Sequence, residues 1–360
     1  MAAERLFVFC FALIVCATVS LGRPSDPQPV KTYDVDLTQH TSQRWNQVLD
    51  DHKELLPGVL DMVRSYIPEE LLPIVQQIAV DIENLIPSPF AQEIIGIADY
   101  WGLDRGDVIL MNILYDVTAF CTSIVAQDNN GTIWHARNLD YDNADLLRNL
   151  TVNIHYKQGN ETLYSGVTYA GYVGILTGQR PNGFTITIDQ RGSEKRRLSP
   201  WWENELTAIL DKSSSFVSFL VRQTLENAKD FTDAVENLAT TVIHATAYII
   251  VGGANKGEGV VITRDRLSAL DRYYLDPLQA RWYVLETNYD RWTQPPPFDN
   301  QRRVVAHREM DKLGTGNINS TTLYNVLSTP PVMNNGTTYT TIMSASQPDV
   351  FNTHVRWPPL

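Results

Sequence analysis

The sequence predicts an α+β protein in which a helical N-terminal segment precedes a body of β-strands and helices. Between residue 42 and about residue 115, apolar side chains recur at intervals typical of one helix face; examples are Trp45, Val48, Leu49, Leu56, Val59, Leu60 and Val63. After Cys121 the pattern changes to short β-rich runs separated by turn residues. Helical periodicity returns between residues 200 and 242. The change of pattern places the boundary between the two regions beside Phe120 and Cys121.

The individual elements follow from these patterns in order. Prolines divide the helical segment, and we expect one helix to begin at Pro89, with Ser88 as its cap, and to end at Gly102. The β-rich runs are CTSIVAQ, TIWHARNLD, LTVNIHY, FTITIDQ, AYIIVGG, GVVITRD and RWYVLETN. The later helices are PWWENELTAIL, SFVSFLVRQTLENA and DFTDAVENLATTV.

Residues 1–22 are predicted to be a cleaved signal peptide. Arg5 gives a basic start, residues 6–19 form an uncharged apolar run too short to span a bilayer, and Gly22 is a small residue suited to cleavage. Removal of this peptide also removes two of the three cysteines, so the mature chain keeps only Cys121. Because one cysteine cannot form a disulfide framework, stability must come from an ordinary hydrophobic core.

Composition supports a luminal glycoprotein. Five N-x-S/T sequons follow the signal peptide: Asn130, Asn149, Asn160, Asn319 and Asn335. A formal net charge of −12 and a pI near 5.0 argue against a nucleic-acid partner. No later stretch has 18 consecutive apolar residues, so we expect no transmembrane helix.

Cys121 begins a predicted strand and is the first candidate for chemistry. A turn at Asn129-Asn130-Gly131 would fold the next strand back, so that Arg137 and Asp140 lie close to the thiol. A guanidinium stabilises a thiolate, and a carboxylate holds an ammonium group in position. The alternatives are that Cys121 is only a small buried apolar residue and that Arg137 and Asp140 form an ion pair at the surface. The seven histidines show no paired-ligand spacing, so no metal site is predicted.

Several segments resemble a known family in its own order along nearly the whole mature chain. They are CTSIVAQDNNGTIWHARNLDY, YAGYVGILTG, GEGVVITRDR, RWYVLETNYDRW, VLSTPPV and TYTTIM. They are similar to the acid ceramidase and N-acylethanolamine acid amidase branch of the choloylglycine hydrolase family of N-terminal nucleophile hydrolases. The resemblance implies a fold with stacked antiparallel β-sheets between helical layers, to which a helical N-terminal chain is added.

The resemblance also implies a mechanism. The precursor would cut itself between Phe120 and Cys121, giving a helical chain of residues 23–120 and a catalytic chain of residues 121–360 that stay together as a heterodimer. The freed α-amine of Cys121 would act as the base, with Arg137 lowering its pKa and Asp140 orienting it. The thiolate would attack a lipid amide and form an acyl-enzyme that water hydrolyses. This chemistry implies no cofactor.

Further site residues come from the same resemblance. The family's oxyanion-binding asparagine corresponds to Asn288, and its active-site arginine to Arg302, with Arg303 as an alternative register in DNQRR. The family's glutamate is replaced by Gln190, and a neutral amide hydrogen-bonds but does not titrate. The residues implied near the substrate are Tyr141, Leu176 and Gln190.

The resemblance implies a lysosomal amidase that hydrolyses N-acylethanolamines to fatty acid and ethanolamine at acidic pH. The single remaining cysteine and the segment SASQPDVFNTHVRW favour this substrate over ceramide, which is the alternative. A non-enzymatic lipid-binding glycoprotein is the alternative of a different class. Apolar residues 71–82 and Trp201-Trp202 either pack on the body or contact lysosomal membrane lipid as a peripheral surface.

Overall fold

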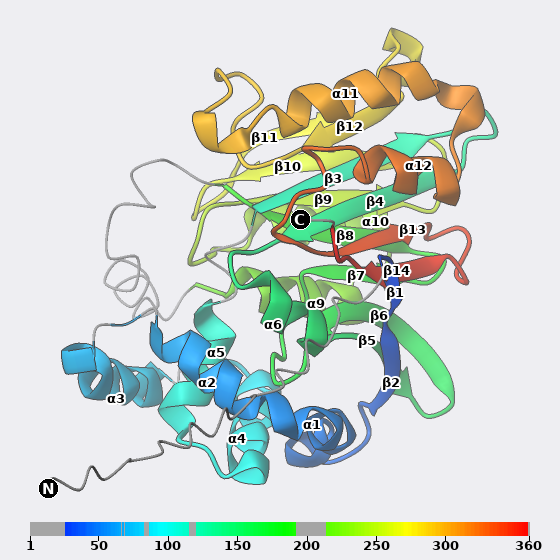
Figure 1. The fold of residues 1–360 in the computed structure, drawn as a ribbon. Coiled ribbons are helices and arrows are strands. Elements are labelled where there is room, and N and C mark those ends of the chain that lie inside the picture. The colour runs from blue at the N-terminus through cyan, green and yellow to red at the C-terminus, as the bar shows by residue number, and fades with distance from the viewer. Residues whose placement is uncertain are drawn as a thin grey trace, which may run out of the picture.

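A computed structural model shows two stacked β-sheets between two layers of helices (Figure 1). The structure describes residues 26–358, except residues 66, 68, 83–85, 115–119 and 192–213. The six-stranded sheet has the order β1 (Gln28–Pro29), β14 (Phe351–Val355), β13 (Thr337–Met343), β4 (Ile133–Asp140), β3 (Phe120–Gln127) and β12 (Tyr283–Glu286). The eight-stranded sheet has the order β11 (Ala269–Tyr274), β10 (Gly259–Arg264), β9 (Ala247–Gly253), β8 (Phe184–Gln190), β7 (Thr177–Arg180), β6 (Glu161–Tyr169), β5 (Thr151–Gln158) and β2 (Lys31–Asp36).

The predicted hairpin after Cys121 is present as β3 and β4. Asp128 organises the turn, because its Oδ1 accepts hydrogen bonds from the backbone N–H groups of Asn130 and Thr132, each at 2.9 Å. Gly131 has φ +89°, a left-handed conformation that glycine adopts without a Cβ penalty. In this register Ser123 lies opposite Arg137, two positions along the strand from Cys121. Because side chains alternate along a strand, all three side chains face the second sheet.

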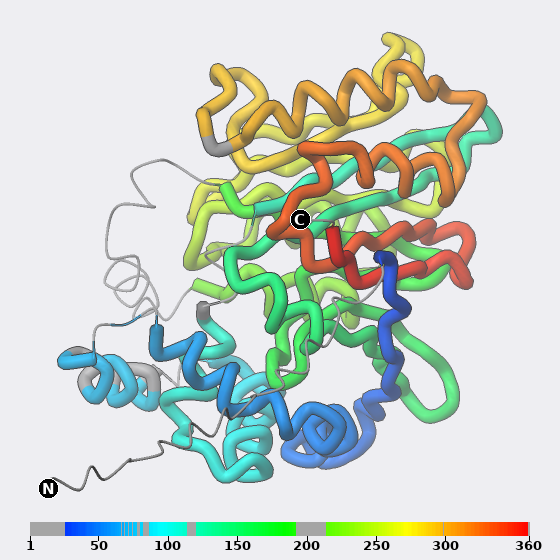
Figure 2. The backbone as a smooth tube through the Cα atoms, viewed as in Figure 1, coloured from blue at the N-terminus to red at the C-terminus, as the bar shows by residue number. Residues whose placement is uncertain are grey.

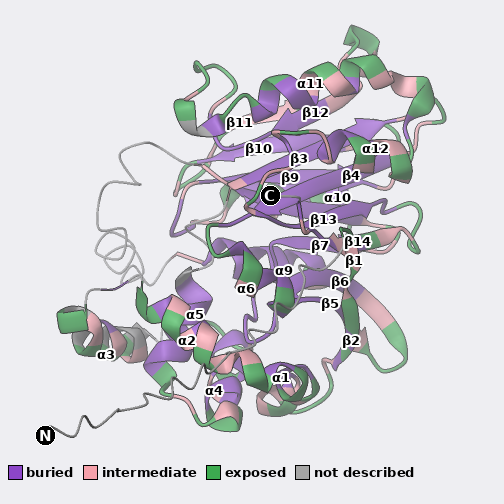
Figure 3. Cartoon of the chain, viewed as in Figure 1, coloured by how far each residue is buried: buried purple, intermediate pink, exposed green. Residues whose placement is uncertain are grey.

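Helices cover the outer face of each sheet, which confirms the predicted layers. α11 (Arg302–Leu313) and α12 (Ser320–Leu327) pack on the six-stranded sheet, where Ala306 and Leu323 meet Ile124 in a buried cluster. α9 (Val217–Asn227) and α10 (Phe231–Thr240) pack on the eight-stranded sheet. The strands between them are buried along most of their length (Figure 3). α6 (Ala144–Leu150) follows β4.

Five helices of the N-terminal segment lie together beside the sheets (Figure 2). They are α1 (Asn46–His52), α2 (Leu56–Ser65), α3 (Leu72–Ile82), α4 (Phe90–Trp101) and α5 (Arg105–Leu114). Gly102 ends α4 in a left-handed conformation with φ 67°, as predicted, but the predicted Ser88 cap is wrong. The helix begins one residue later than expected, so Pro89 occupies the cap position. Pro89 makes no side-chain capping bond.

The N-terminal segment also contributes a strand to each sheet, which corrects its prediction as purely helical. β1 pairs antiparallel with β14, and β2 pairs parallel with β5. Tyr33 and Val35 of β2 are buried against the core of the eight-stranded sheet. The second pairing is also an exception to the predicted antiparallel sheets. Short 3₁₀ turns complete the fold: Thr41–Gln43, Lys53–Leu55, Glu69–Leu71, Pro277–Gln279, Pro297–Asp299 and Thr315–Asn317.

Some predictions concern residues that the structure does not describe. The signal peptide, the helix PWWENELTAIL and the pair Trp201-Trp202 lie outside the described ranges. In the apolar segment of residues 71–82, Val75 is buried and Leu72 packs partly against the core. Within the described part of the chain, no helix has both the length and the apolar character needed to cross a bilayer.

Candidate active site

Cys121 is fully buried at the start of β3, and the second sheet covers its side chain. Arg137 donates a hydrogen bond from Nη2 to the Cys121 Sγ at 3.0 Å. Sγ also lies 3.7 Å from the carbonyl oxygen of Ile188. Burial raises the pKa of the thiol well above its usual value, Arg137 opposes this rise, and the carboxylates of Asp189 and Asp140 add to it. The thiol is therefore neutral in the uncut chain.

The Arg137 guanidinium is held rigidly between the two sheets. Its Nη1 donates to Thr177 Oγ1 at 2.6 Å, to Tyr339 Oη at 3.2 Å and to the Leu176 carbonyl at 3.3 Å. Its Nη2 donates to the Ile188 carbonyl at 3.0 Å as well as to the thiol. A planar guanidinium held at both ends presents a fixed positive charge to the sulfur. This arrangement stabilises any thiolate that forms at Cys121.

Two residues from distant parts of the chain hold the backbone of Cys121. Asn288 Oδ1 accepts the Cys121 N–H at 2.9 Å, and Arg302 Nη1 donates to the Cys121 carbonyl at 2.6 Å. These two side chains also bond to each other, from Arg302 Nη2 to Asn288 Oδ1 at 2.8 Å. Asn288 Nδ2 in turn donates to the backbone carbonyl of Gln190 at 2.8 Å. These bonds fix the backbone of Cys121, next to the predicted cleavage point.

Asp140 lies at the end of β4, directly opposite Phe120 in the strand register. Its Oδ2 accepts a hydrogen bond from Asn334 Nδ2 at 2.9 Å and lies 3.6 Å from Arg302 Nη1. Burial raises the pKa of Asp140, while Arg302 and Asn334 oppose the rise. A carboxylate in this place is positioned to accept a hydrogen bond from an amine at residue 121.

The structure also distinguishes the two arginines that the sequence left open. Arg302 contacts Cys121, whereas Arg303 turns to Glu286 and the carbonyl of Tyr289. Arg302 is therefore the arginine of the candidate site. Among the residues expected near the substrate, Leu176 contacts Arg137 through its carbonyl.

The remaining two residues expected near the substrate differ in how they approach the site. Gln190 contributes its backbone carbonyl to Asn288, and its side chain is half-buried. Tyr141 packs edge-on against Tyr169, with ring centroids 6.2 Å apart, and Tyr169 in turn packs on Tyr339. Tyr141 is thus joined to the Arg137 neighbourhood through two aromatic rings.

The structure brings to the site several residues that no sequence pattern had marked. They are Ser123, Thr177, Asp189, Asn334 and Tyr339. Strand alternation was the available indication for Ser123, because it lies on the same face as Cys121. The other four come from strands or loops far along the chain, and no local pattern marks them.

The five sequon asparagines are all exposed, as glycan attachment requires. Among the described residues, no three His, Cys, Asp or Glu side chains gather in a group suited to a metal ion.

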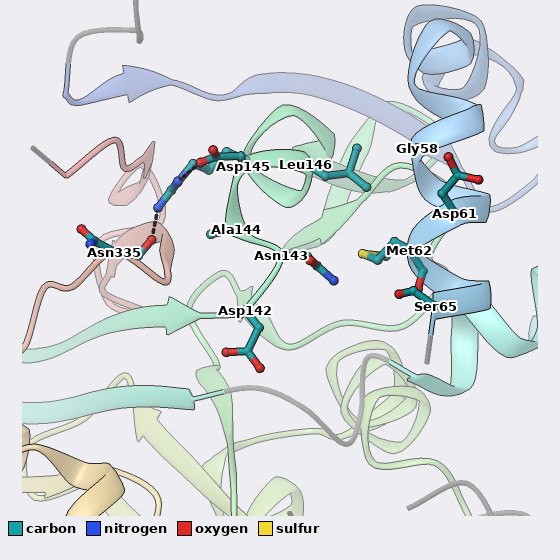
Figure 4. Close-up of a pocket in the computed structure, with 11 residues that line it drawn as sticks. Gly58, Asp61, Met62, Ser65, Asp142, Asn143, Ala144, Asp145, Leu146 and Asn335 are labelled. Atoms are coloured by element: carbon teal, nitrogen blue, oxygen red, sulfur yellow. Dashed lines mark hydrogen bonds and ion pairs between the residues drawn. The ribbon is translucent and has the colours of Figure 1, made fainter. Parts of the chain in front are cut away.

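A surface pocket of about 560 Å³ lies between α2 and the turn that follows β4 (Figure 4). The turn begins two residues after Asp140, and its Asp142 and Asn143 line the pocket together with Asp61 and Met62 of α2. Several carboxylates face this space, so its lining is too polar for a fatty acyl chain. We therefore do not assign the acyl chain to this pocket.

Comparisons with known proteins agree with this geometry. Residues 121–321 match the family described as linear amide C–N hydrolases, choloylglycine hydrolase family, and residues 28–86 match the beta subunit of N-acylethanolamine-hydrolyzing acid amidase. An N-acylethanolamine-hydrolyzing acid amidase of Rattus norvegicus is 39% identical over 96% of each chain, and an acid ceramidase of Heterocephalus glaber is 35% identical over 95% of this chain and 94% of its own. The solved structure of a Caenorhabditis elegans N-acylethanolamine-hydrolyzing acid amidase ortholog has a TM-score of 0.59 at 37% identity, covering 66% of this chain and all of its own. The helical and double-sheet fold, the cysteine at the head of β3 and these matches together show that the chain is an amide hydrolase with the N-terminal nucleophile fold and belongs to the choloylglycine hydrolase family.

Proposed function

We propose that this protein is a lysosomal amidase that hydrolyses N-acylethanolamines at acidic pH, after it has cut itself between Phe120 and Cys121. The observation that carries the proposal is the surroundings of Cys121 in the uncut chain. Its sulfur lies 3.0 Å from a fixed guanidinium, and Asn288 and Arg302 hold its peptide N–H and carbonyl. These contacts hold the sulfur and the backbone of Cys121 in place next to the peptide bond that precedes it.

Self-cleavage begins when the Cys121 sulfur attacks the carbonyl carbon of Phe120. The C–N bond to Cys121 breaks, a thioester forms, and the thiol proton ends on the nitrogen of Cys121, which becomes an amine. Water then hydrolyses the thioester and leaves a carboxylate on Phe120 and a free thiol on Cys121. Arg137 stabilises the sulfur anion as it forms, because its Nη2 donates a hydrogen bond to Sγ at 3.0 Å.

Cleavage also supplies the base for the amidase reaction. In the uncut chain the nitrogen of Cys121 is an amide that donates to Asn288, and it has no basicity. After cleavage this nitrogen is an amine beside the Asp140 carboxylate, which orients it, and it takes the proton of the thiol. The thiolate attacks the substrate amide, the protonated amine departs, and water releases the fatty acid.

The full burial of Cys121 supports the proposal that the uncut chain is a zymogen. With no exposed sulfur surface, a lipid amide does not reach the thiol until the chain around Phe120 has separated. Cleavage therefore activates the enzyme in two ways: it creates the α-amine that acts as the base, and it allows the substrate to reach the Cys121 thiol.

The choice of substrate rests on the relatives. Those named N-acylethanolamine-hydrolyzing acid amidases are 39–42% identical to this chain, whereas those named acid ceramidases are 35–36% identical. The match of residues 28–86 to a subunit of the amidase points the same way. Ceramide hydrolysis is the second candidate. A lysosomal lumen, glycans on the exposed sequons and peripheral contact with membrane lipid belong to the same proposal.

The test uses the full chain and its Cys121→Ala variant, secreted from cells and incubated at pH 5. We expect wild type to give a new N-terminus at Cys121, and the variant to stay as one chain. The processed enzyme should then show a higher kcat/KM for palmitoylethanolamide than for ceramide in the same detergent, because this ratio reports differential transition-state binding. A higher kcat/KM for ceramide than for palmitoylethanolamide would favour ceramide hydrolysis, the second candidate function. Lipid binding without turnover would select a non-enzymatic lipid-binding protein.

A further inference from the structure

Asp189 is a buried carboxylate beside the nucleophile to which the proposed mechanism gives no role. It lies on β8, a strand of the eight-stranded sheet that packs against β3 of the other sheet, and its side chain is 0% exposed. Its Oδ1 accepts a hydrogen bond from Ser123 Oγ at 2.8 Å and lies 3.5 Å from Arg137 Nη2. Among the residues that the structure describes, its Oδ2 has no hydrogen-bond partner. A carboxylate that is half-satisfied and out of water is costly to keep charged.

The thiol and this carboxylate share one nitrogen of Arg137. Nη2 lies 3.0 Å from Cys121 Sγ and 3.5 Å from Asp189 Oδ1. When Asp189 is ionised, it neutralises part of the guanidinium charge and also repels a thiolate at Cys121. When Asp189 is protonated, it no longer competes for the guanidinium, whose charge is then available to a thiolate that forms at Cys121. The charge on Asp189 therefore works against ionisation of the thiol.

We propose that the protonation state of Asp189 governs the nucleophilicity of Cys121 in the uncut chain, so that Asp189 sets the pH at which the protein cuts itself. The inference rests on the self-cleavage proposed above and adds a positioning residue to it. Protonated Asp189 leaves Arg137 to the sulfur, and cleavage proceeds. Ionised Asp189 pairs with Arg137, and cleavage becomes slower.

The other charged and titratable groups around Asp189 do not supply this pH dependence. On β4, burial lowers the pKa of His135 to about 3, so it is neutral from weakly acid to neutral pH. Burial raises the pKa of both tyrosines that face this region, Tyr248 on β9 and Tyr339 on β13, so both stay neutral. Arg302 and Arg303 approach from α11 as cations. None of these groups changes charge between a neutral compartment and an acidic one.

The two carboxylates near the thiol differ in their partners. Asp140 has Asn334 at 2.9 Å and Arg302 at 3.6 Å, and these partners oppose the effect of burial on its pKa. Burial raises the pKa of Asp189 to about 7, although Arg137 and the Ser123 hydroxyl oppose the rise. The charge of Asp189 thus changes between neutral pH and pH 5, which is the interval that a secreted precursor crosses on its way to an acidic compartment.

The experiment measures the rate of self-cleavage of purified full-length precursor between pH 4.5 and pH 8.5. For wild type we expect the rate to fall about tenfold between the acid plateau and pH 8, as for one group with a midpoint near 7. Asp189→Asn should cut at pH 8 within about twofold of its own rate at pH 5. If Asp189 instead acts as the base that takes the thiol proton, this variant cuts at no pH, and the inference is wrong.

A second variant keeps the test decisive if Asp189→Asn does not fold. Ser123→Ala removes the hydroxyl that stabilises ionised Asp189, so the midpoint of cleavage should move up by about one pH unit. An unchanged midpoint in this variant overturns the inference.

Asp107→Asn is the matched control. Asp107 is also a buried carboxylate paired with an arginine, at 2.6 Å from Arg64 Nη2, but it lies on α5 and contacts neither the thiol nor Arg137. Its variant should keep the wild-type midpoint, and a loss of pH dependence like that expected for Asp189→Asn would show that removal of any buried charge has the effect. If wild type cuts at no pH, the proposed self-cleavage fails. If wild type cuts and Asp189→Asn keeps the same midpoint, only the role of Asp189 fails.

Discussion

Glu93 joins the N-terminal segment to the body of the protein through a fully buried ion pair, and its removal should be costly. Glu93 lies on α4 and accepts hydrogen bonds from both Nη atoms of Arg222 on α9, at 2.6 and 2.8 Å. Arg44 and Trp45 of its own segment each donate a further bond at 2.8 Å. The side chains of Glu93 and Arg222 are both 0% exposed. Glu93→Gln would therefore leave a guanidinium charge in the core without an anion.

We expect Glu93→Gln to lower the free energy of unfolding by about 3–5 kcal/mol, the range for removing one partner of a buried ion pair. The assay is denaturant unfolding followed by tryptophan fluorescence, in a Cys121→Ala background that keeps the chain uncut. Glu309→Gln is the control, because Glu309 pairs with the exposed Arg308 and Lys312. A double variant in which Glu93 and Arg222 both become Met should recover much of the loss, since the fully buried Arg222 charge is removed together with its anion and only the Arg44 charge, whose side chain is 10% exposed, loses its partner. A loss below about 1 kcal/mol for Glu93→Gln would refute the reasoning.

The same pair predicts how the two chains separate after cleavage, because Glu93 belongs to residues 23–120 and Arg222 to residues 121–360. Burial acts to raise the pKa of Glu93, but Arg222, Trp45 and Arg44 outweigh it and lower the pKa below 4.5. A carboxyl whose folded pKa is depressed contributes stability above its unfolded pKa and loses it as pH falls through the folded value. The chains should therefore co-elute in gel filtration at pH 5 and begin to separate only below about pH 4.5. Separation of the two chains already at pH 6 would contradict the lowered pKa of Glu93.

Three further outcomes are expected. Arg302→Gln should slow self-cleavage by at least tenfold, measured by gel densitometry at pH 5, because it removes the 2.6 Å bond to the Cys121 carbonyl; a rate within twofold of wild type would exclude that role. Asp189→Asn should stabilise the uncut chain at pH 8, by up to about 4 kcal/mol, and little at pH 4. The reason is that the Asp189 carboxyl, whose pKa is raised from 3.8 to about 7 by folding, lowers the stability of the wild-type chain progressively as pH rises from 3.8 to about 7; equal melting shifts at both pH values would contradict it. A bulky maleimide should label Cys121 only after cleavage, as mass spectrometry would detect, because the sulfur is fully buried before it.

The sequence predicted the part of the site that one hairpin builds. Cys121 and Arg137 lie on adjacent strands joined by a short turn, so their proximity follows from a local register. The contact of Arg302 with Cys121 joins residues 181 positions apart, and only the resemblance to a family indicated it. No role was predicted for Asp189, because its position beside Arg137 depends on how the two sheets stack. No local pattern encodes that stacking.

The strands of the N-terminal segment were missed for a similar reason. β2 has only two apolar side chains, Tyr33 and Val35, and they alternate with charged and polar residues. An isolated strand of this kind is not stable, and β2 exists because it pairs with β5, in which Ile154 lies opposite Tyr33. β1 is two residues long and depends in the same way on β14. The strands that were predicted have longer apolar runs.

These strands and their packing predict that residues 121–360 do not fold without the N-terminal segment. Besides β1 and β2, the N-terminal segment supplies Phe90, which stacks on Phe219 with centroids 4.5 Å apart, and Trp45, which packs on Tyr156. Residues 121–360 alone would expose these surfaces and the edges of both sheets, so this chain expressed by itself should aggregate and show no cooperative unfolding.

Co-expression with residues 23–120 should restore soluble amidase if the two chains can still assemble after synthesis. A soluble, active chain of residues 121–360 would show that the N-terminal segment is dispensable. The site itself argues against this outcome, because the strand that carries Cys121 is aligned by a core that the N-terminal segment completes. Self-cleavage should then follow folding, and precursor held in denaturant at pH 5 should stay uncut until the denaturant is diluted. Cleavage in the denatured state would show that the peptide around Phe120 is reactive without the folded site.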